Sequence, residues 1–260
     1  MSDARAIVLE VESLSKRYEG AEAVRDLSFS AAAGEILGLV GPNGAGKTTT
    51  LRTIAGILPI QAGRVRIGGR DLAREEVAAK RLLAWVPDDP QPFDTLTVEE
   101  HLEFTAALHQ LGEWRARAED LLALHELVEK RAALGGELSR GMRQKLALCQ
   151  AWLPRPRLML LDEPLSGLDP RGIRSAREAI RALAASGTAV LLSSHQLELI
   201  EALADRILIL HRGERVFLGT LAEARATHVG AAGTSLEEIF LAATSERGAH
   251  AAERVPPEQA

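Results

Sequence analysis

A glycine-rich segment near the start of the chain matches the G-x-x-x-x-G-K-[ST] phosphate-binding pattern in full. Its residues are Gly41, Pro42, Asn43, Gly44, Ala45, Gly46, Lys47 and Thr48, with Thr49 as a further expected nucleotide contact. Glycines let backbone N–H groups close around phosphate oxygens, and the start of the following helix adds its partial positive charge. Lys47 is expected to reach the β- and γ-phosphates, and the Thr48 hydroxyl to ligate Mg²⁺. The alternative, a simple turn between a strand and a helix, has no need for Lys and Thr after the last glycine.

Two adjacent carboxylates, Asp162 and Glu163, follow the apolar residues 158–161. An aspartate at the end of a buried strand can hold the water shell of a metal ion opposite the phosphate loop. Glu163 is then placed to orient or deprotonate an attacking water. A plain exit from strand to loop would also explain the pair, but that explanation becomes weak beside a phosphate loop.

The elements around these residues predict an α/β protein with a parallel sheet. An apolar strand over 36–40 and a helix over 48–57 flank the phosphate loop, as the binding chemistry requires. The expected later elements are strands at 158–162 and 188–192, helices over 171–185 and 197–204, and a hairpin of 206–210 with 215–218. Short β-prone runs at 7–11, 24–29 and 63–69 predict an antiparallel β lobe beside this core.

Residues 97–153 have a helical pattern, with a capping-box start at Thr97 and a helix expected over 114–128. Before them, Pro87, Pro90 and Pro92 exclude a continuous helix and predict an exposed loop. This loop is either a moving part that feeds the helical region or a rigid connection. At the other end of the chain, Ser235 is expected to cap a short helix, and residues 245–260 are expected to form a flexible tail.

Residues 138–145, with the sequence LSRGMRQK, make the chain recognisable. They resemble the signature segment of ATP-binding-cassette (ABC) ATPases. The order of the motifs also resembles that family across residues 7 to about 244: phosphate loop, signature, LDEP at 161–164, SGLD at 166–169 and SSH at 193–195.

This resemblance implies a nucleotide-binding P-loop core, an antiparallel β lobe and a helical signature lobe, with ATP and Mg²⁺ as ligands. It implies that Tyr18 stacks on adenine and that His195 holds the γ-phosphate, although a packed β-lobe tyrosine is the alternative for Tyr18. Ser139 and Gly141, at a predicted helix start, would bind the γ-phosphate held by an opposite subunit, with Asp169 lining that contact. The second subunit would be a copy of this chain or a homologous ATPase subunit.

Two positions depart from the common family pattern. Arg140 and Met142 stand where the usual signature has glycine and glutamine, a variation that resembles the exporter branch with separately encoded membrane subunits. Asp88 occupies the position at which the family has a loop glutamine that senses Mg²⁺. By this resemblance Asp88 is expected to act as a metal ligand. The alternative is a shifted loop in which Gln91 supplies the ligand.

Composition places the chain among ordinary globular proteins, with 260 residues, 46% hydrophobic and 26% charged. A net charge of -5 argues against a broad nucleic-acid surface, so no nucleic-acid partner is expected. The single cysteine, Cys149, excludes an internal disulfide and is expected to be a packed core thiol. No run approaches the roughly 18 apolar residues of a membrane span, and the first residues do not have the pattern of a signal peptide.

We therefore expect one ABC ATPase domain over residues 7–244, with the core at about 7–86 and 157–220 and the helical lobe at about 95–153. The leading function is ATP hydrolysis that drives a separate transmembrane permease, most simply an exporter, docked near the Asp88 loop and the helical lobe. The expected location is the cytoplasmic face of the cell membrane, through that permease. The alternatives are a soluble ABC ATPase acting on ribosomes or DNA, which the size and charge of the chain disfavour, and a non-catalytic scaffold, which Glu163 disfavours.

Overall fold

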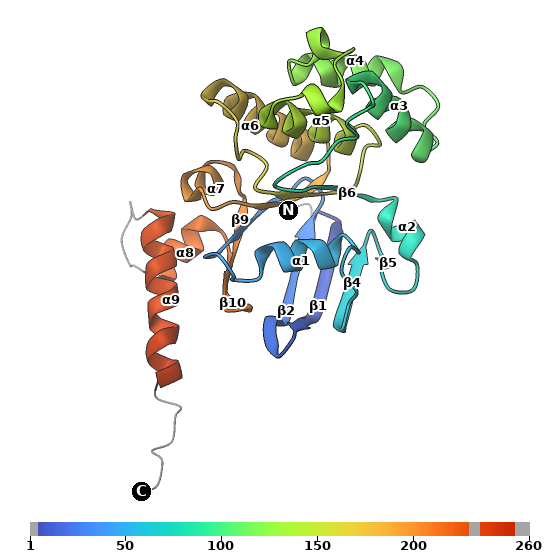
Figure 1. The fold of residues 1–260 in the computed structure, drawn as a ribbon. Helices are drawn as coiled ribbons and strands as arrows, with labels where there is room; N and C mark the ends of the chain where they lie inside the picture. Colours follow the sequence, from blue (N-terminus) through green and yellow to red (C-terminus); the bar gives the residue numbers. More distant parts are fainter. Residues whose placement is uncertain (1–4, 229–234, 253–260) are drawn as a thin grey trace, which may run out of the picture.

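The computed structural model describes residues 5–228 and 235–252, which form two sheets and a group of helices (Figure 1). A four-stranded antiparallel sheet has the order β2-β1-β4-β5. Its strands are β1 Ile7–Tyr18, β2 Ala21–Ala32, β4 Ala62–Ile67 and β5 Arg70–Asp71. The turn between β1 and β2 falls at Glu19 and Gly20, where both residues have positive φ. The predicted antiparallel lobe is therefore present.

The second sheet has six strands in the order β10-β9-β3-β8-β7-β6. All neighbours pair in parallel except β9 and β10, which form the expected hairpin. The strands are β3 Ile36–Val40, β6 Leu83–Val86, β7 Leu158–Asp162, β8 Ala189–Ser193, β9 Arg206–His211 and β10 Glu214–Gly219. Strands β3, β7 and β8 are buried along their whole length, because both faces of the sheet are covered.

Helices cover this sheet and build a lobe beside it, at the top of the view in Figure 1. The helices are α1 Lys47–Ile54, α2 Glu76–Lys80, α3 Val98–Leu108, α4 Arg115–Leu124, α5 Arg140–Trp152, α6 Pro170–Ala185, α7 Leu197–Leu203, α8 Leu221–His228 and α9 Leu236–Ala252. Short 3-10 turns lie at Val128–Lys130 and Gly135–Glu137. Thr97 and Glu100 form the predicted capping box at the start of α3.

The two faces of the parallel sheet belong to different cores, because successive strand residues point to opposite sides. Leu37 and Leu39 of β3 pack with α1 and the antiparallel lobe. Ile36 and Val40 of the same strand pack with α6 and α7. This double burial fixes the strand that leads into the phosphate loop.

A third core holds α3, α4 and α5 together around residues such as Leu102, Leu122 and Leu146. Cys149 lies in this core, and its burial raises the pKa of the thiol well above the usual range. The prediction of a packed core thiol is therefore confirmed.

Several elements differ from the sequence expectation. Helix α4 ends at Leu124, where the chain turns through Glu126 with φ of 56°. Helix α9 continues to Ala252, so the backbone of residues 245–252 is helical where a tail was expected, and the remaining tail residues lie outside the described ranges. The sequence analysis did not identify the short elements α2, β5 and β6, or helix α8.

Candidate active site

The phosphate loop connects the carboxyl end of β3 to the amino end of α1. Gly44 and Gly46 have φ of 79° and 103°, in the region that favours glycine, and Gly46 is the N-cap of the helix. A Cβ atom at Gly46 would lie 2.4 Å from the carbonyl oxygen of Ala23, so a side chain cannot fit there. The loop therefore lies directly against β2 at Gly46.

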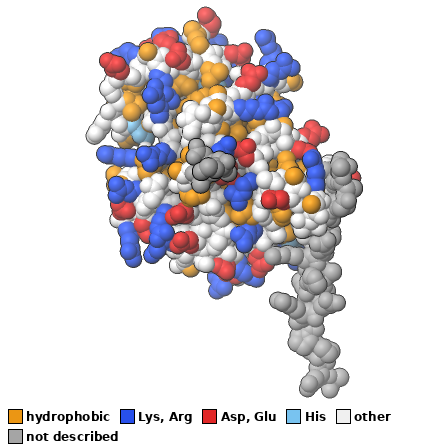
Figure 2. Space-filling view, turned by 180° about the vertical axis from the view of Figure 1, so that it is seen from behind, with side chains coloured by type: hydrophobic (Ala, Val, Ile, Leu, Met, Phe, Trp, Pro, Cys, Tyr) orange, Lys and Arg blue, Asp and Glu red, His pale blue; other side chains and the backbone are white. Residues whose placement is uncertain are grey.

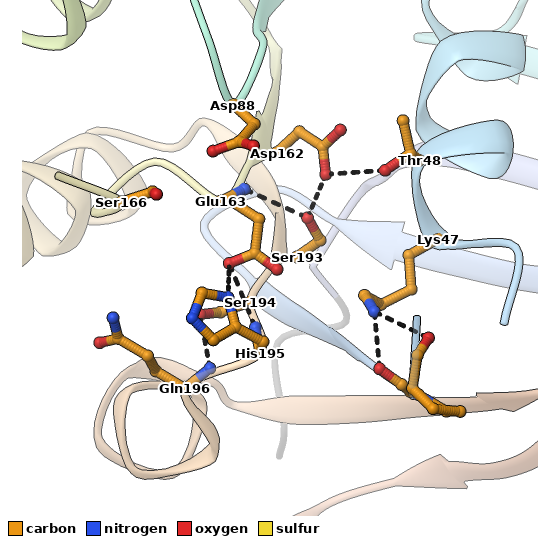
Figure 3. Close-up of polar contacts among 12 residues, drawn as sticks. Lys47, Thr48, Asp88, Asp162, Glu163, Ser166, Ser193, Ser194, His195 and Gln196 are labelled. Atoms are coloured by element: carbon orange, nitrogen blue, oxygen red, sulfur yellow. Dashed lines mark hydrogen bonds and ion pairs between the residues drawn. The ribbon is translucent and has the colours of Figure 1, made fainter. Parts of the chain in front are cut away.

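Lys47 is 8% exposed and bends back over this loop. Its Nζ donates hydrogen bonds to the carbonyl oxygens of Gly41 at 2.6 Å and Pro42 at 3.2 Å (Figure 3). Burial lowers the pKa of Lys47, while the carboxylates of Glu163 and Asp162 act in the opposite direction. The ammonium group thus lies within the loop and in the field of both carboxylates.

Asp162 joins the phosphate loop to the neighbouring strand β8. The residue is 3% exposed, and its Oδ1 accepts hydrogen bonds from Ser193 Oγ at 2.6 Å and Thr48 Oγ1 at 3.3 Å (Figure 3). This contact exists because Asp162 and Ser193 are register partners at the carboxyl ends of β7 and β8. One carboxylate and two hydroxyl groups form the all-oxygen environment that Mg²⁺ prefers.

Glu163 and His195 make a direct contact next to this group. His195 Nδ1 lies 2.8 Å from Glu163 Oε2, and the same oxygen accepts the backbone N–H of His195 at 3.1 Å (Figure 3). Glu163 has φ of 49°, a strained conformation for a residue with a side chain. Its own backbone N–H donates to the carbonyl oxygen of Ser193 at 3.1 Å. The strained turn directs the carboxylate toward His195.

Ser139, Gly141 and Asp169 do not join this cluster. The Ser139 hydroxyl caps α5 by accepting the N–H of Met142 at 3.3 Å, and Asp169 caps α6 by accepting the N–H of Gly172 at 2.7 Å. Ser139 and Asp169 are exposed. Within the described residues, none of the three has a hydrogen bond to the phosphate loop.

Tyr18 lies at the end of β1 and is 43% exposed, so it is not a packed residue of the antiparallel lobe. The Lys16 ammonium lies 5.8 Å from the centroid of its ring. An exposed ring of this kind is available for stacking.

Asp88 is exposed on the loop that follows β6, and its carboxylate pairs with Arg140 at 3.3 Å. Gln91 donates from Nε2 to Asp89 at 2.7 Å. In the part of the chain that the structure describes, neither Asp88 nor Gln91 has a hydrogen bond to Thr48 or Asp162.

The sequence analysis missed the contribution of Ser193 and the contacts of Ser166 and Arg140. Ser193 precedes His195 by two residues and ends a buried strand, which could have marked it as a neighbour of Asp162. The contact of Arg140 with Ser166 at 2.9 Å spans 26 residues, and no local pattern reports it.

Comparisons with known proteins identify the family to which this chain belongs. A family model described as "ABC transporter" matches residues 24–166, and one described as "AAA domain, putative AbiEii toxin, Type IV TA system" matches residues 132–201. The chain is 35% identical over 215 residues to the linearmycin resistance ATP-binding protein LnrL of Bacillus subtilis (strain 168), covering 82% of this chain and 69% of that protein. It is 32% identical over 245 residues to the ABC-type transporter ATP-binding protein EcsA of the same organism, covering 94% and 99%.

A solved structure described as "Structure of ATP binding subunit of ABC transporter" superposes with a TM-score of 0.87 at 35% identity, covering 91% of this chain and 99% of that one. The chain belongs to the family of ABC transporter ATP-binding subunits. Members of this family bind and hydrolyse ATP, so the protein is an ATPase. Among its described helices, none combines the length and hydropathy needed to cross a bilayer.

Proposed function

We propose that this chain powers a separately encoded transmembrane permease, and that two ATPase subunits close around two Mg-ATP molecules during each cycle. The observation that carries the catalytic part is the contact of Glu163 with His195 beside the Asp162, Thr48 and Ser193 cluster. Glu163 would accept a proton from the attacking water, and His195 would hold both the carboxylate and the γ-phosphate. Lys47 and the loop N–H groups would bind the β- and γ-phosphates.

We propose Mg²⁺ as the metal because Thr48 and Asp162 offer hard oxygen donors at one point. The described residues contain no group of three or more His, Cys, Asp or Glu side chains able to hold a metal. Such a site depends on nucleotide oxygens, which is the usual manner of binding Mg²⁺. The ion, when present, neutralises charge on the phosphates. The sequence-based prediction for Asp88 as a further ligand is not needed in this arrangement.

The pairing of two subunits is supported by the position of Ser139, Gly141 and Asp169. These residues have no hydrogen bond to the phosphate loop of their own chain, yet Ser139 and Asp169 are exposed at helix starts, where N–H groups and the helix dipole attract phosphate. A second subunit, either a copy or a homologous ATPase subunit, would present its phosphate loop to them. Tyr18 would stack on the adenine of its own nucleotide.

The permease contact is supported by a cavity of about 760 Å³ between α2, β6, the loop over residues 87–96, α3 and α5. Its lining includes Trp85, Phe93, Phe104 and Leu108 together with Lys80 and Arg81. The rings of Phe93 and Phe104 lie edge to face with centroids 5.6 Å apart, and Phe104 is 47% exposed. A mostly apolar groove with basic side chains fits an amphipathic segment of a membrane protein that carries acidic groups.

We propose residues 7–244 as the functional unit, held at the cytoplasmic face of the membrane through the permease. Export is the proposed direction, because LnrL is named as a resistance protein. A role on nucleic acid gains no support, since the net charge is -5 and the face in Figure 2 mixes Lys and Arg with Asp and Glu.

The test is co-expression with the product of a neighbouring reading frame that carries several apolar spans of roughly 20 residues, followed by co-purification. Phe104→Asp should reduce the permease-bound fraction at least about tenfold, because it removes an aromatic contact from the groove and repels the acidic groups proposed for the partner. The matched control is Leu241→Asp on α9, where the leucine is also exposed, at 55%, and lies outside the groove. Equal loss in both variants, or no loss in Phe104→Asp, would contradict the groove as the docking site.

A further inference from the structure

Arg140, the first residue of α5, connects three segments that are distant in the sequence. Its Nη2 atom donates to Ser166 Oγ at 2.9 Å and to Asp88 Oδ1 at 3.3 Å. Ser166 begins the loop over residues 166–169, which follows Glu163 and ends at the cap of α6. Asp88 belongs to the loop over residues 87–96 that lines the proposed permease groove. The guanidinium group of Arg140 therefore links the start of α5 to the loop over residues 166–169 and to the loop over residues 87–96.

The stem of Arg140 also lies against the backbone of Gly167. A Cβ atom at Gly167 would stand 3.0 Å from Arg140 Cδ and 3.2 Å from Nε, and Gly167 has φ of 76°. The left-handed backbone favours glycine here, and the absence of a side chain lets the stem of Arg140 lie close to the loop. Gly141 adds a second contact, since a Cβ atom there would lie 3.4 Å from the Gly167 carbonyl oxygen. The start of α5 is thus seated directly on the 166–169 loop.

The two aspartates in the loop over residues 87–96 face two arginines at the start of α5. Arg140 and Arg143 place two cations in the first turn of α5, which contains no acidic residue. Cations are unfavourable at the positive end of a helix. Asp88 faces Arg140 at 3.3 Å, and Asp89 faces Arg143 at 4.0 Å, so the loop supplies the missing negative charge. Both pairs are partly exposed and each stabilises the fold only weakly.

The far end of the same loop is held independently. The N–H of Phe93 donates to His101 Nε2 at 2.9 Å, and His101 Nδ1 lies 2.7 Å from the carbonyl oxygen of Thr97. The loop is therefore held at two points, by Arg140 at Asp88 and by His101 at Phe93.

We propose that Arg140 is a positioning residue for ATP hydrolysis, which holds the 166–169 loop in place, and that Asp88 is its counter-ion rather than a metal ligand. This proposal rests on the proposed function only in treating the groove as the permease site. A permease segment that moves residues 87–96 would shift Asp88, release Arg140 and change the position of the 166–169 loop beside Glu163.

The first experiment needs neither nucleotide nor permease: amide hydrogen exchange of the full chain, followed in peptides covering residues 87–96 and 166–169. Arg140→Gln should raise exchange in both peptides roughly two- to fivefold. Both peptides respond because Arg140 contacts both loops, and the effect is modest because each exposed contact is weak. The double variant Asp88→Arg with Arg140→Asp reverses the pair and should restore protection in residues 87–96, whereas Asp88→Arg alone should not. The control is Glu103→Arg with Arg115→Glu, an exposed pair at 3.9 Å in the same lobe.

Unchanged exchange in Arg140→Gln, or no restoration by the reversed pair, would overturn the proposed contact. This result would leave the proposed function intact, since ATP hydrolysis is not measured. Failure of permease co-purification, in contrast, would leave the exchange result standing.

The second experiment separates positioning from phosphate or metal binding. Arg140→Gln should lower kcat about fivefold while KM for ATP stays within about twofold, since the guanidinium is expected to act through the 166–169 loop. Asp88→Ala, which removes every side-chain oxygen at this position, should keep the Mg²⁺ concentration for half-maximal hydrolysis unchanged. A raised KM in Arg140→Gln would assign Arg140 to the nucleotide instead, and a raised Mg²⁺ requirement in Asp88→Ala would restore its role as a metal ligand. Either result overturns the corresponding half of the proposal.

Discussion

One oxygen of Glu163 accepts two contacts from a single residue, the ring nitrogen Nδ1 of His195 at 2.8 Å and its backbone N–H at 3.1 Å. The side chain of Glu163 is 17% exposed and that of His195 is 61% exposed. The carboxylate is therefore fixed from the protein side by a residue whose ring reaches solvent. A carboxylate held in this way is suited to accept a proton from water, which is the role proposed for Glu163.

Glu163→Gln should lower the rate of ATP hydrolysis about 10²- to 10⁴-fold, the usual contribution of a general base. The amide oxygen can still accept the N–H of His195, so ATP binding should persist and a closed dimer should accumulate. Phosphate release gives the rate, and size-exclusion chromatography with ATP and Mg²⁺ gives the dimer. Hydrolysis at the parent rate would show that another group is the base.

Lys47→Ala should weaken ATP binding about tenfold or more, because charged hydrogen bonds to phosphate are among the stronger ones. The same change removes the bonds from Nζ to the Gly41 and Pro42 carbonyl oxygens. Calorimetric titration with ATP measures the affinity, with Lys130→Ala as an exposed lysine control. Equal affinity in the parent and in Lys47→Ala would remove Lys47 from the binding site.

Composite sites can be tested by mixing two inactive proteins, one with Ser139→Arg and one with Lys47→Ala. Because Ser139 is proposed to act on the partner's nucleotide, each mixed dimer has one site with both lesions and one site with neither. A random equal mixture should regain about one quarter of the parent specific activity. Absence of any recovery, once mixed dimers have been demonstrated by a tag on each subunit, would argue that Ser139 does not act across the interface.

Stability should fall in mild acid because of His125, which is buried in the helical lobe. Burial, assisted by the nearby Lys145 charge, lowers the pKa of His125 from 6.5 to about 4. Between these two pH values His125 is protonated in the unfolded chain but neutral in the folded chain. The free energy of unfolding therefore decreases as the pH falls from about 6.5 to about 4. The loss amounts to about 3 kcal/mol from this group.

The measurement is the free energy of unfolding by urea at several pH values, for the parent and for His125→Leu. The Nε2 atom of His125 has no hydrogen-bond partner among the described residues, so leucine sacrifices no bond at that atom. His125→Leu should flatten the pH dependence in this window. An equally steep acid loss in both proteins would place its origin in other groups.

The local features of the site could be predicted from the sequence, because each is encoded within a few neighbouring residues. The phosphate loop between β3 and α1, the carboxylates after β7 and the cap at Thr97 follow from short patterns of glycine, apolar and capping residues. The order of motifs also identified the family, which the comparisons confirm. The predicted end of the last helix was wrong. Helix α9 runs to Ala252, and the glycine and alanines over residues 248–252 carry little periodic signal.

The order of the strands in the parallel sheet could not be predicted from the sequence alone. The phosphate loop, Asp162 and Ser193 lie far apart in the sequence, and only the pairing of β7 with β8, and of β8 with β3, brings them to one edge of the sheet. The contact between Asp88 and Arg140 spans 52 residues and depends on how the helical lobe is seated on the sheet. A sequence determines turns, caps and burial patterns through local conformational preference. Contacts between distant segments depend instead on the packing of a whole core, so only the tertiary structure decided that Asp88 meets an arginine.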